Sequence, residues 1–347
     1  MTRNRGWTYR VQVGPEAAGR SVLAYLADTY AHSAADAWAA RLMGGEVEVD
    51  GRHARGDEAL RPGQLISWHR PPWCEPDVPL HFDVLFEDAS ILAVCKPAGL
   101  PTMPAGGFLE HTLLTLVRAR HPQARPVHRL GRFTSGVVLF ALSTAAASAL
   151  GRAFREHRVT KYYRALGCRV PAWAEKEISQ PIGPVPHPRL GSVFAASVHG
   201  RPAHSTAQVV ERRDDETVFD VRITTGRPHQ IRIHLAFAGH PLAGDPLYAE
   251  GGTPRVPDPG LPGDGGYVLH AHRLGFTHPA TGQALEVIAP LPPPLVARQE
   301  RQSSSAVPSI RHEAAGPHDP EGAGTAPSSR SRRPVHGGTA ASGGRAR

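Results

Sequence analysis

The stretch that decides the fold of this chain is residues 127–140, Val-His-Arg-Leu-Gly-Arg-Phe-Thr-Ser-Gly-Val-Val-Leu-Phe. Its second half opens a continuous apolar run, residues 137–142, of the kind that forms a fully buried central strand. The polar residues before this run end in Thr134-Ser135-Gly136 and predict a tight loop that enters the strand. Polar loops held by buried strands are frequent places for residues that bind or react.

The segments on either side predict many strands and few helices. Strands are expected at residues 84–87, 91–95, 159–170, 205–212 and 217–225. Helices are expected at 112–120, at 143–156 with Ser143 as its N-cap, and from Pro228 to Gly239. Because no β-α-β rhythm repeats, the pattern favours an α+β fold around a mixed, mostly antiparallel sheet.

Residues 19–70 predict a separate small domain. Apolar residues at helical spacing follow Gly19, and Ser33 is expected to cap a second helix that runs through Leu42 and is stopped by Gly44-Gly45. Asp50-Gly51 is typical of a hairpin turn. We therefore expect an N-terminal extension at 1–18, the small domain at 19–70, a proline-rich linker at 71–81 and a large domain at 82–298. Residues 299–347 are rich in Ser, Gly, Pro and Arg and predict a disordered basic tail.

The charge and the cysteines limit the class of protein. From Arg301 onward, seven arginines and three acidic residues give a net charge of +4, half of the +8 of the whole chain. The remaining balance permits a nucleic-acid partner without requiring one, and the tail either adds salt-sensitive RNA affinity or is only solvated. Three scattered cysteines, no signal-peptide pattern and no long apolar run favour a cytoplasmic protein that does not cross a membrane.

Three further segments share a pattern with the 127–140 stretch: Lys96-Pro97-Ala98-Gly99-Leu100, Lys161-Tyr162-Tyr163, and residues 226–234, Gly-Arg-Pro-His-Gln-Ile-Arg-Ile-His. In this order and at these separations, the chain resembles the RluA-type RNA pseudouridine synthases. The resemblance implies the α+β pseudouridine synthase fold in the large domain and an RNA substrate, with rRNA expected in preference to tRNA. It also implies a monomer that isomerises uridine to pseudouridine without a cofactor or metal. The small domain resembles the S4-type RNA-binding module, either as an RNA grip or in a packing role.

The resemblance also implies roles for the motif residues. Tyr163 matches the active-site tyrosine of the family, which stacks on the base or moves a proton. Arg232 matches the arginine that pairs with the catalytic carboxylate. Contact with RNA, or support of the loops that contact it, is implied for Lys96, His128, Arg129, Arg132, Thr134, Ser135, Lys161 and His229.

One position departs from the family pattern, because Gly131 occupies the place of the catalytic aspartate. Glycine can act neither as a nucleophile nor as an acid or base. Two interpretations stay open: another carboxylate, with Asp88 and Asp245 as candidates, performs the chemistry, or the protein binds structured RNA without isomerising it. The departure also leaves Arg232 in need of a different anion, either a carboxylate or an RNA phosphate.

A different class, a metal-dependent hydrolase, is suggested only by the 20 histidines and by His270-Ala271-His272. The sequence has no helical Glu/Asp-His pair of the kind that binds zinc in such enzymes. We therefore expect no metal site.

Overall fold

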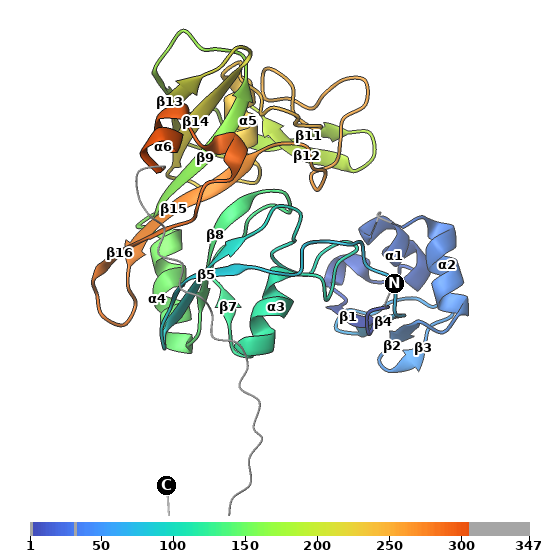
Figure 1. Cartoon of the computed structure of the whole chain (residues 1–347). Helices are drawn as coiled ribbons and strands as arrows, with labels where there is room; N and C mark the ends of the chain where they lie inside the picture. Colours follow the sequence, from blue (N-terminus) through green and yellow to red (C-terminus); the bar gives the residue numbers. More distant parts are fainter. Residues whose placement is uncertain (1–2, 31–32, 305–347) are drawn as a thin grey trace, which may run out of the picture. The chain divides into compact units, whose positions relative to one another are not determined.

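The computed structural model describes residues 3–30 and 33–304, so most of the predicted basic tail lies outside the described residues. Within them, the predicted α+β architecture with a mixed, mostly antiparallel sheet is confirmed (Figure 1). None of the helices in this part of the chain is both long and apolar enough to cross a membrane.

The N-terminal domain is a four-stranded antiparallel sheet in the order β1-β4-β2-β3, with two helices packed on it. Its elements are β1 (Trp7–Gln12), the 3-10 turn η1 (Pro15–Ala17), α1 (Val22–Thr29), α2 (Ala35–Met43), β2 (Val47–Val49), β3 (Arg52–His53) and β4 (Leu65–Arg70). The predicted start of this domain at residue 19 is therefore too late. The segment expected as an extension contains β1, which pairs with β4 from Trp7↔Arg70 to Gln12↔Leu65.

Local signals explain most of this small domain, although the N-cap of α2 is Ala34, without a side-chain hydrogen bond, and not Ser33 as predicted. The side chain of Ser21 accepts a hydrogen bond from the Ala24 N–H and caps α1. The turn at Asp50 and Gly51 has positive φ at both residues, as the hairpin signal predicts. Trp38, Leu26 and Ile66 are almost fully buried and form the core between helices and sheet.

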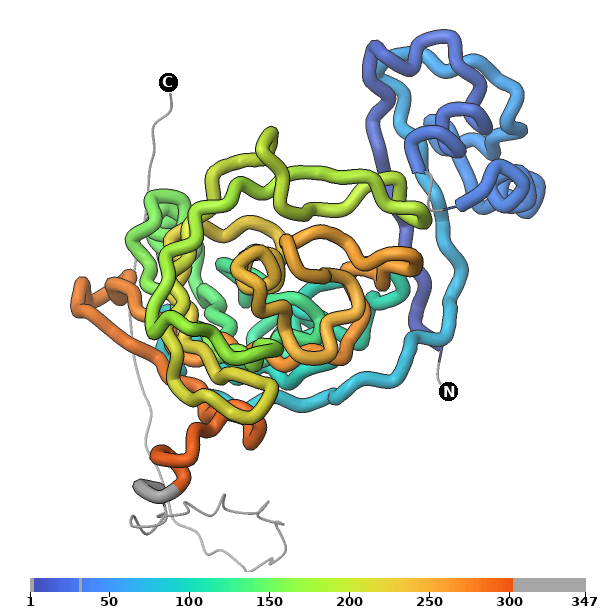
Figure 2. Tube along the Cα trace, turned by 90° about the horizontal axis from the view of Figure 1, so that it is seen from above, coloured from blue at the N-terminus to red at the C-terminus, as the bar shows by residue number. Residues whose placement is uncertain are grey.

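The segment expected as a linker at 71–81 is anchored on both sides. Asn4 donates through its backbone N–H to the carbonyl of Trp73 at 3.0 Å and through its side chain to Glu75 at 2.7 Å. Glu75 in turn accepts from the N–H groups of Glu110 and His111. Residues 3–6 and 73–75 consequently run side by side (Figure 2).

The large domain contains a sheet of ten strands, counted within the described residues, in the order β10-β13-β14-β9-β15-β8-β6-β5, with β16 on β15 and β7 on β8. All pairs are antiparallel except β15 with β8. The bounds are β5 (Asp83–Glu87), β6 (Ile91–Lys96), β7 (Arg125–Pro126), β8 (Ser135–Ala141), β9 (Thr160–Cys168), β10 (Glu175–Ile178), β13 (Ser205–Arg212), β14 (Glu216–Ile223), β15 (Leu269–Thr277) and β16 (Ala284–Ile288). A two-stranded hairpin, β11 (Ile182–His187) with β12 (Gly191–Ala196), stands outside this sheet.

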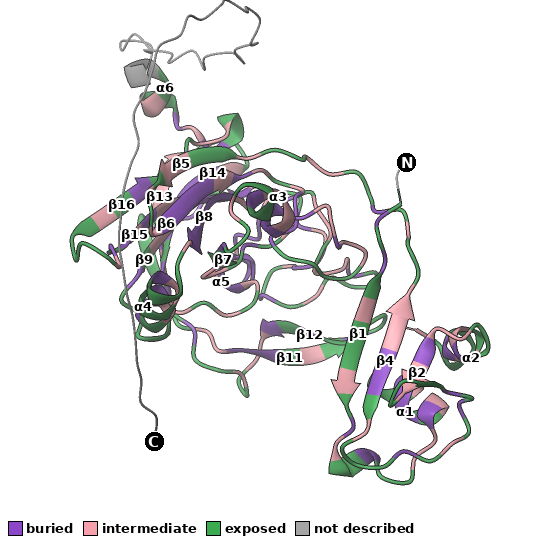
Figure 3. Cartoon of the chain, turned by 90° about the horizontal axis from the view of Figure 1, so that it is seen from below, coloured by how far each residue is buried: buried purple, intermediate pink, exposed green. Residues whose placement is uncertain are grey.

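Strand β8 is the expected buried centre, and its residues 136–141 are all buried (Figure 3). Alternate residues of this strand face different helices. Val137 and Leu139 pack with α4 (Thr144–Arg155), whereas Val138 and Phe140 pack with α3 (Leu113–Arg120). Ser143 caps α4 as predicted. A third cluster lies between α5 (Gln230–Phe237) and strands β9, β14 and β15.

Two helix boundaries differ from the expectation. Pro228 precedes α5 rather than lying in its first turn, because His229 adopts a left-handed conformation (φ 55°) as the N-cap. Helix α6 (Arg298–Ser304), which follows the 3-10 turn η2 (Pro293–Leu295), occupies the start of the predicted tail. Its Glu300 accepts two hydrogen bonds from the buried Arg164, at 2.9 and 3.0 Å, and Arg164 also pairs with Asp220 at 2.7 Å. A long-range ion pair thus orders a helix whose composition predicts none.

Candidate active site

The loop of residues 127–135 lies between β7 and β8 and is held by hydrogen bonds at both ends of its turn. The N–H of Thr134 donates to the carbonyl of Gly131 at 3.1 Å. The hydroxyl of Thr102 donates to the carbonyl of Leu130 at 3.0 Å and lies 3.2 Å from the Leu130 N–H. Leu130 belongs to the cluster under α3, whereas Phe133 packs against the cluster under α5. The loop therefore connects the apolar cluster under α3 with the apolar cluster under α5.

Lys96 fastens the first motif to this loop from inside the protein. Its Nζ donates to the carbonyls of Pro97, Leu100 and Arg132 at 2.8, 2.7 and 3.0 Å, and the residue is fully buried. Burial lowers the pKa of Lys96 to about 7. The expected contact between Lys96 and RNA disagrees with this burial, because the ammonium is enclosed by protein acceptors. Its role in the structure is to join residues 96–100 to the loop.

The two glycines of the 127–140 stretch, Gly136 and Gly131, differ in whether the backbone requires glycine. Gly136 has φ +106°, and a Cβ there would lie 2.2 Å from the Ala271 carbonyl oxygen, so the close approach of β8 to β15 requires glycine. Gly131 is exposed, and its backbone is not left-handed. A Cβ at this position would lie 3.4 Å from Thr134 Oγ1 and 3.6 Å from Tyr267 Oη, which are ordinary contacts. The backbone therefore tolerates a side chain at 131.

Arg232 has a partner of its own. Its Nε and Nη2 donate to the two carboxylate oxygens of Asp245 at 2.7 and 2.8 Å, and the residues are 2% exposed each. Burial alone would lower the pKa of Arg232, but the hydrogen bonds and charge of Asp245 outweigh it and raise that pKa. Of the two anions left open by the sequence, the carboxylate is the one present. The guanidinium also lies 4.2 Å from the centre of the Tyr267 ring, whose hydroxyl faces Gly131.

Asp245 is saturated by this arrangement. Beyond the two bonds from Arg232, its Oδ1 accepts from the N–H groups of Leu247 and Tyr248 at 2.9 and 3.1 Å. A carboxylate with four donors and no exposure is a structural anchor rather than a group free to attack a substrate. The other candidate, Asp88, lies in the turn between β5 and β6. That turn is at the far end of β8, since Ile91 pairs with Ala141 while Lys96 pairs with Gly136, roughly 17 Å of strand away.

His229 is enclosed next to this ion pair. Its Nδ1 lies 2.7 Å from the Tyr248 hydroxyl, which itself donates to the Phe194 carbonyl at 2.6 Å. Since the hydroxyl has a single proton, Nδ1 must donate to it. Burial, followed by the charge of Arg232, lowers the pKa of His229 to about 4. The expected RNA contact of His229 disagrees with this position, and the histidine serves the fold as a hydrogen-bond donor.

Tyr163 lies on β9 between the two clusters. It pairs with Val221 on one side and with Ala271 on the other, and Ala271 pairs with Gly136 of the motif loop's strand. The side chain packs against both the α3 and the α5 clusters, the same two that the loop joins. Burial raises the pKa of Tyr163 to about 12, so its hydroxyl stays protonated at neutral pH. The structure thus places Tyr163, Arg232 and the Gly131 loop on one face of the sheet.

The other predicted RNA contacts divide by exposure. Arg129 is exposed on the loop, and its charge helps to lower the pKa of His229, the N-cap of α5. Arg132 is partly exposed; its Nε donates to the Gly99 carbonyl at 3.0 Å, and its guanidinium lies between Phe108 and Phe133 at 4.7 and 4.9 Å from the ring centres.

Of the remaining residues, His128 and Ser135 support the loop, and Lys161 lies beside Tyr163. His128 accepts the Leu139 N–H through Nε2 at 3.1 Å and stacks on Phe154. Of its two predicted roles, these contacts favour holding the loop over contact with the RNA backbone. Ser135 pairs with His270 at 2.8 Å. Lys161 is half-buried on the same strand as Tyr163, and burial lowers its pKa.

A segment that the sequence did not single out lines this site. The carbonyl of Pro262 accepts from Arg232 at 3.3 Å, a Cβ on Gly265 would lie 2.5 Å from the Phe133 ring, and Tyr267 Oη faces Gly131. Residues 262–267 therefore run from the arginine to the motif loop. Asp264 lies on this segment; its Oδ2 accepts the Leu261 N–H at 2.7 Å, and no described residue donates to its Oδ1. The only signal in the sequence is the Gly-rich stretch around this aspartate.

No cluster of three or more metal-binding side chains occurs among residues 3–30 and 33–304. The Nδ1 of His270 lies 2.8 Å from Ser135 Oγ, and the Nδ1 of His272 lies 2.9 Å from the Ala289 carbonyl. The His-Ala-His pattern therefore belongs to the packing of β15.

Comparison with known proteins identifies the family of the chain. Residues 90–237 match the family model described as RNA pseudouridylate synthase. The chain is 45% identical over 280 residues to an "uncharacterized RNA pseudouridine synthase" of Synechocystis sp., covering 79% of this chain and 95% of the relative. It is 34% identical to the ribosomal large subunit pseudouridine synthase D of Neisseria meningitidis serogroup B, covering 78% and 75%.

The fold agrees as well. The solved structure of human RNA pseudouridylate synthase domain containing 1 superimposes with a TM-score of 0.51 at 26% identity, covering 69% of this chain and all of the human one. The shared fold, the matching family model and the coverage of whole relatives lead to a single assignment: the chain belongs to the RNA pseudouridine synthase family of isomerases.

Proposed function

We propose that this enzyme isomerises one specific uridine of a structured RNA, with ribosomal RNA as the substrate in preference to transfer RNA. The observation that carries the proposal is the meeting of Tyr163, the Arg232–Asp245 pair and the Gly131 loop on one sheet face. The choice of ribosomal RNA is supported by relatives named ribosomal large subunit pseudouridine synthase D, at 32–34% identity.

The reaction defines what the site must supply. The N1–C1′ bond of uridine breaks, the uracil turns, a C5–C1′ bond forms, C5 loses a proton and N1 gains one. An enzyme that acts on a base also extracts it from the stack and holds it against a flat side chain. Tyr163 and Tyr267 provide aromatic faces at the site, and the exposed Arg129 provides a cation for a backbone phosphate.

The proton leaving C5 needs a base, and Gly131 has none. We propose that Asp264 supplies the carboxylate that the family carries at position 131. The segment that bears it touches both sides of the gap, through Phe133 and through the hydroxyl of Tyr267. Asp245 is fully engaged by Arg232, and Asp88 lies at the wrong end of β8.

A second function stays in competition, that of an RNA-binding protein that no longer isomerises uridine. It is favoured by one observation, the absence of a side chain at position 131. The two functions make opposite predictions for RNA in the cell.

The test is a map of pseudouridine in total RNA from cells with and without the gene, complemented with wild type, Asp264→Asn or Asp245→Asn. Isomerisation by this chain predicts that one site disappears on deletion and returns with wild type. It also predicts that Asp264→Asn fails to restore the site although the protein is folded and binds RNA. If wild type binds RNA but no site depends on the gene, the RNA-binding function is correct. If Asp264→Asn restores the site fully, Asp264 is not the base.

A further inference from the structure

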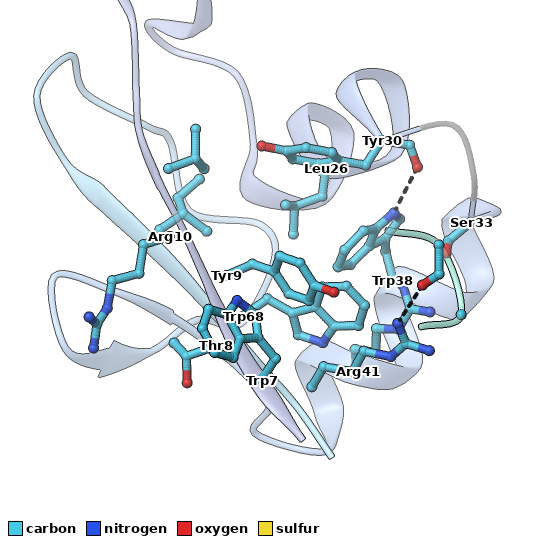
Figure 4. A pocket seen from close by; sticks show the side chains of 15 residues that line it. Trp7, Thr8, Tyr9, Arg10, Leu26, Tyr30, Ser33, Trp38, Arg41 and Trp68 are labelled. Atoms are coloured by element: carbon cyan, nitrogen blue, oxygen red, sulfur yellow. Dashed lines mark hydrogen bonds between the residues drawn. The ribbon is translucent and has the colours of Figure 1, made fainter. Parts of the chain in front are cut away.

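The N-terminal domain contains a cavity of about 780 Å³, a volume typical of small-molecule sites (roughly 300–1,000 Å³) (Figure 4). It opens between β1 and β4 of the sheet and the helices α1 and α2. Strand alternation places Trp7, Tyr9 and Val11 of β1 on the cavity side, opposite Arg70, Trp68 and Ile66 of β4. Helices α1 and α2 contribute Leu26, Trp38 and Arg41.

The cavity wall presents flat aromatic surface, part of which lies outside the core of the domain. The rings of Tyr9 and Trp68 are stacked at 5.2 Å, and Trp38 meets Trp68 edge-on at 5.0 Å. Trp7 and Tyr9 are 46% and 42% exposed and lie outside the core of this domain. Exposed, adjacent aromatic rings in a concave surface favour a ligand with a flat face.

A cation stands at the end of this aromatic wall. The guanidinium of Arg41 lies between Trp38 and Trp68, 4.4 and 4.5 Å from the ring centres. Its Nη1 is buried and has no hydrogen-bond partner. The nearby Glu46 accepts from Trp68 Nε1 at 3.0 Å, and its charge favours the protonated form of Arg41 without supplying an acceptor to Nη1. Since an unpaired buried donor is costly, this nitrogen favours a ligand that brings an acceptor.

The charged residues that line the cavity indicate which charge the ligand carries. No acidic residue is among the described residues that line the cavity, whereas Arg41 and Arg70 both are. Arg70 is partly engaged, since it donates to the Gly106 carbonyl at 3.3 Å and stacks on Trp73 at 3.4 Å. A cationic ligand would therefore be repelled, and a purely apolar one would leave Arg41 Nη1 unpaired. A flat ring joined to an anion satisfies both features.

We propose that this cavity binds one unpaired nucleotide of the RNA substrate, with the base against Trp7 and Tyr9 and a phosphate at Arg41. The inference rests on the proposed function, because it takes RNA as the substrate. Stacking on aromatic side chains accepts any base. The cavity would accordingly hold a single-stranded or extruded nucleotide beside the target without reading its identity.

The test uses the full chain and a hexauridylate with one 5-iodouridine, which crosslinks to nearby aromatic residues on irradiation. The expected result is a crosslinked peptide that contains Trp7, Tyr9 or Trp68. Trp7→Ala should weaken binding of the unmodified hexamer about tenfold, the middle of the range for one stacked base. Trp7→Phe should retain binding, since it keeps a ring. Met43→Ala is the matched control, because Met43 is on α2 and 84% exposed outside the cavity.

Arg41 is tested with two small probes, uridine monophosphate and uridine, by quenching of tryptophan fluorescence. Wild type should prefer the monophosphate, and Arg41→Gln should remove that preference. Crosslinks found only in residues 82–298, or variants that bind as wild type does, would overturn the proposal. Pseudouridine formation by wild type is measured separately, so a negative result for the cavity does not affect the proposed isomerase function. Trp7-dependent binding without any isomerised uridine would instead contradict the proposed function alone.

Discussion

Replacing Asp245 with asparagine tests whether the ion pair with Arg232 is an anchor of the fold. The side chains have the same shape, so the change removes the charge and one acceptor. If the amide oxygen keeps the place of Oδ1, it still accepts from Arg232 Nη2 and from the N–H groups of Leu247 and Tyr248. The amide NH2 then faces Arg232 Nε, where the carboxylate accepts a bond of 2.7 Å. A donor would meet a donor, and the buried guanidinium would lose its counter-charge.

The magnitude follows from the burial of this pair. Removing one partner of a buried ion pair costs about 3–5 kcal/mol, a large part of the roughly 5–15 kcal/mol that stabilises a domain. For a domain of this size the unfolding midpoint should fall by about 6–20 °C. The assay is thermal unfolding followed by far-ultraviolet circular dichroism, with amide hydrogen exchange to locate the change at α5 and residues 242–248. Asp264→Asn is the control, because it loses only a turn bond.

The double variant Arg232→Met, Asp245→Leu separates structure from chemistry. Apolar replacement of both partners of a buried ion pair is often neutral or stabilising, so the midpoint should recover toward wild type. Isomerisation should not recover if the guanidinium also orients groups at the site. An Asp245→Asn protein as stable as wild type would refute the account of this pair as an anchor.

Three further outcomes are expected. Tyr163→Phe should abolish pseudouridine formation in a single-turnover assay and leave the unfolding midpoint unchanged, because only the hydroxyl is removed from a ring that packs against two clusters. Lys96→Met should lower the free energy of unfolding by about 2–4 kcal/mol in urea titration, since three backbone carbonyls lose their donor. Because the pKa of Lys96 is about 7 in the folded protein and 10.5 in the unfolded chain, wild-type stability should rise with pH between those values, and this slope should vanish in the variant. Burial lowers the pKa values of His128, His229 and His234 to about 4 from 6.5, so the stability they contribute should be complete above pH 6.5 and be lost as the pH falls toward 4 in an acid titration.

Elements that depend on local signals were predictable, and those that depend on distant partners were not. The apolar run of β8 and the Ser143 cap of α4 are written in adjacent residues, and both are confirmed. The sequence predicts an extension where β1 lies, because the place of β1 in the sheet depends on β4, more than 50 residues later. The composition predicts a disordered tail where α6 lies. The helix is ordered by the ion pair of Glu300 with Arg164, which lies 136 residues earlier in the chain and leaves no local signal.

The same limit applies to the site. The sequence indicated that Arg232 requires an anion but left several candidates, and the choice of Asp245 depends on how the chain after α5 folds back onto that helix. Residues 262–267 lack any hydrophobic period, so neither Asp264 nor Tyr267 stood out. For Lys96 and His229 the resemblance implies either RNA contact or support of the loops, and burial, which a motif does not show, favours support.

The resemblance to the family implies a carboxylate at position 131, and with Gly131 in its place the rest of the site is intact for an electrostatic reason. An arginine whose only counter-ion was the missing carboxylate would be left as a buried, uncompensated charge and would be lost with it. Here Asp245 neutralises Arg232 completely, so Gly131 leaves neither an orphaned cation nor a steric gap that must close. The retained arginine therefore says nothing about whether position 131 must carry an acid. What decides activity is whether a carboxylate on the segment that spans Arg232 and Tyr267 reaches the uracil, and Asp264 is the acid on that segment.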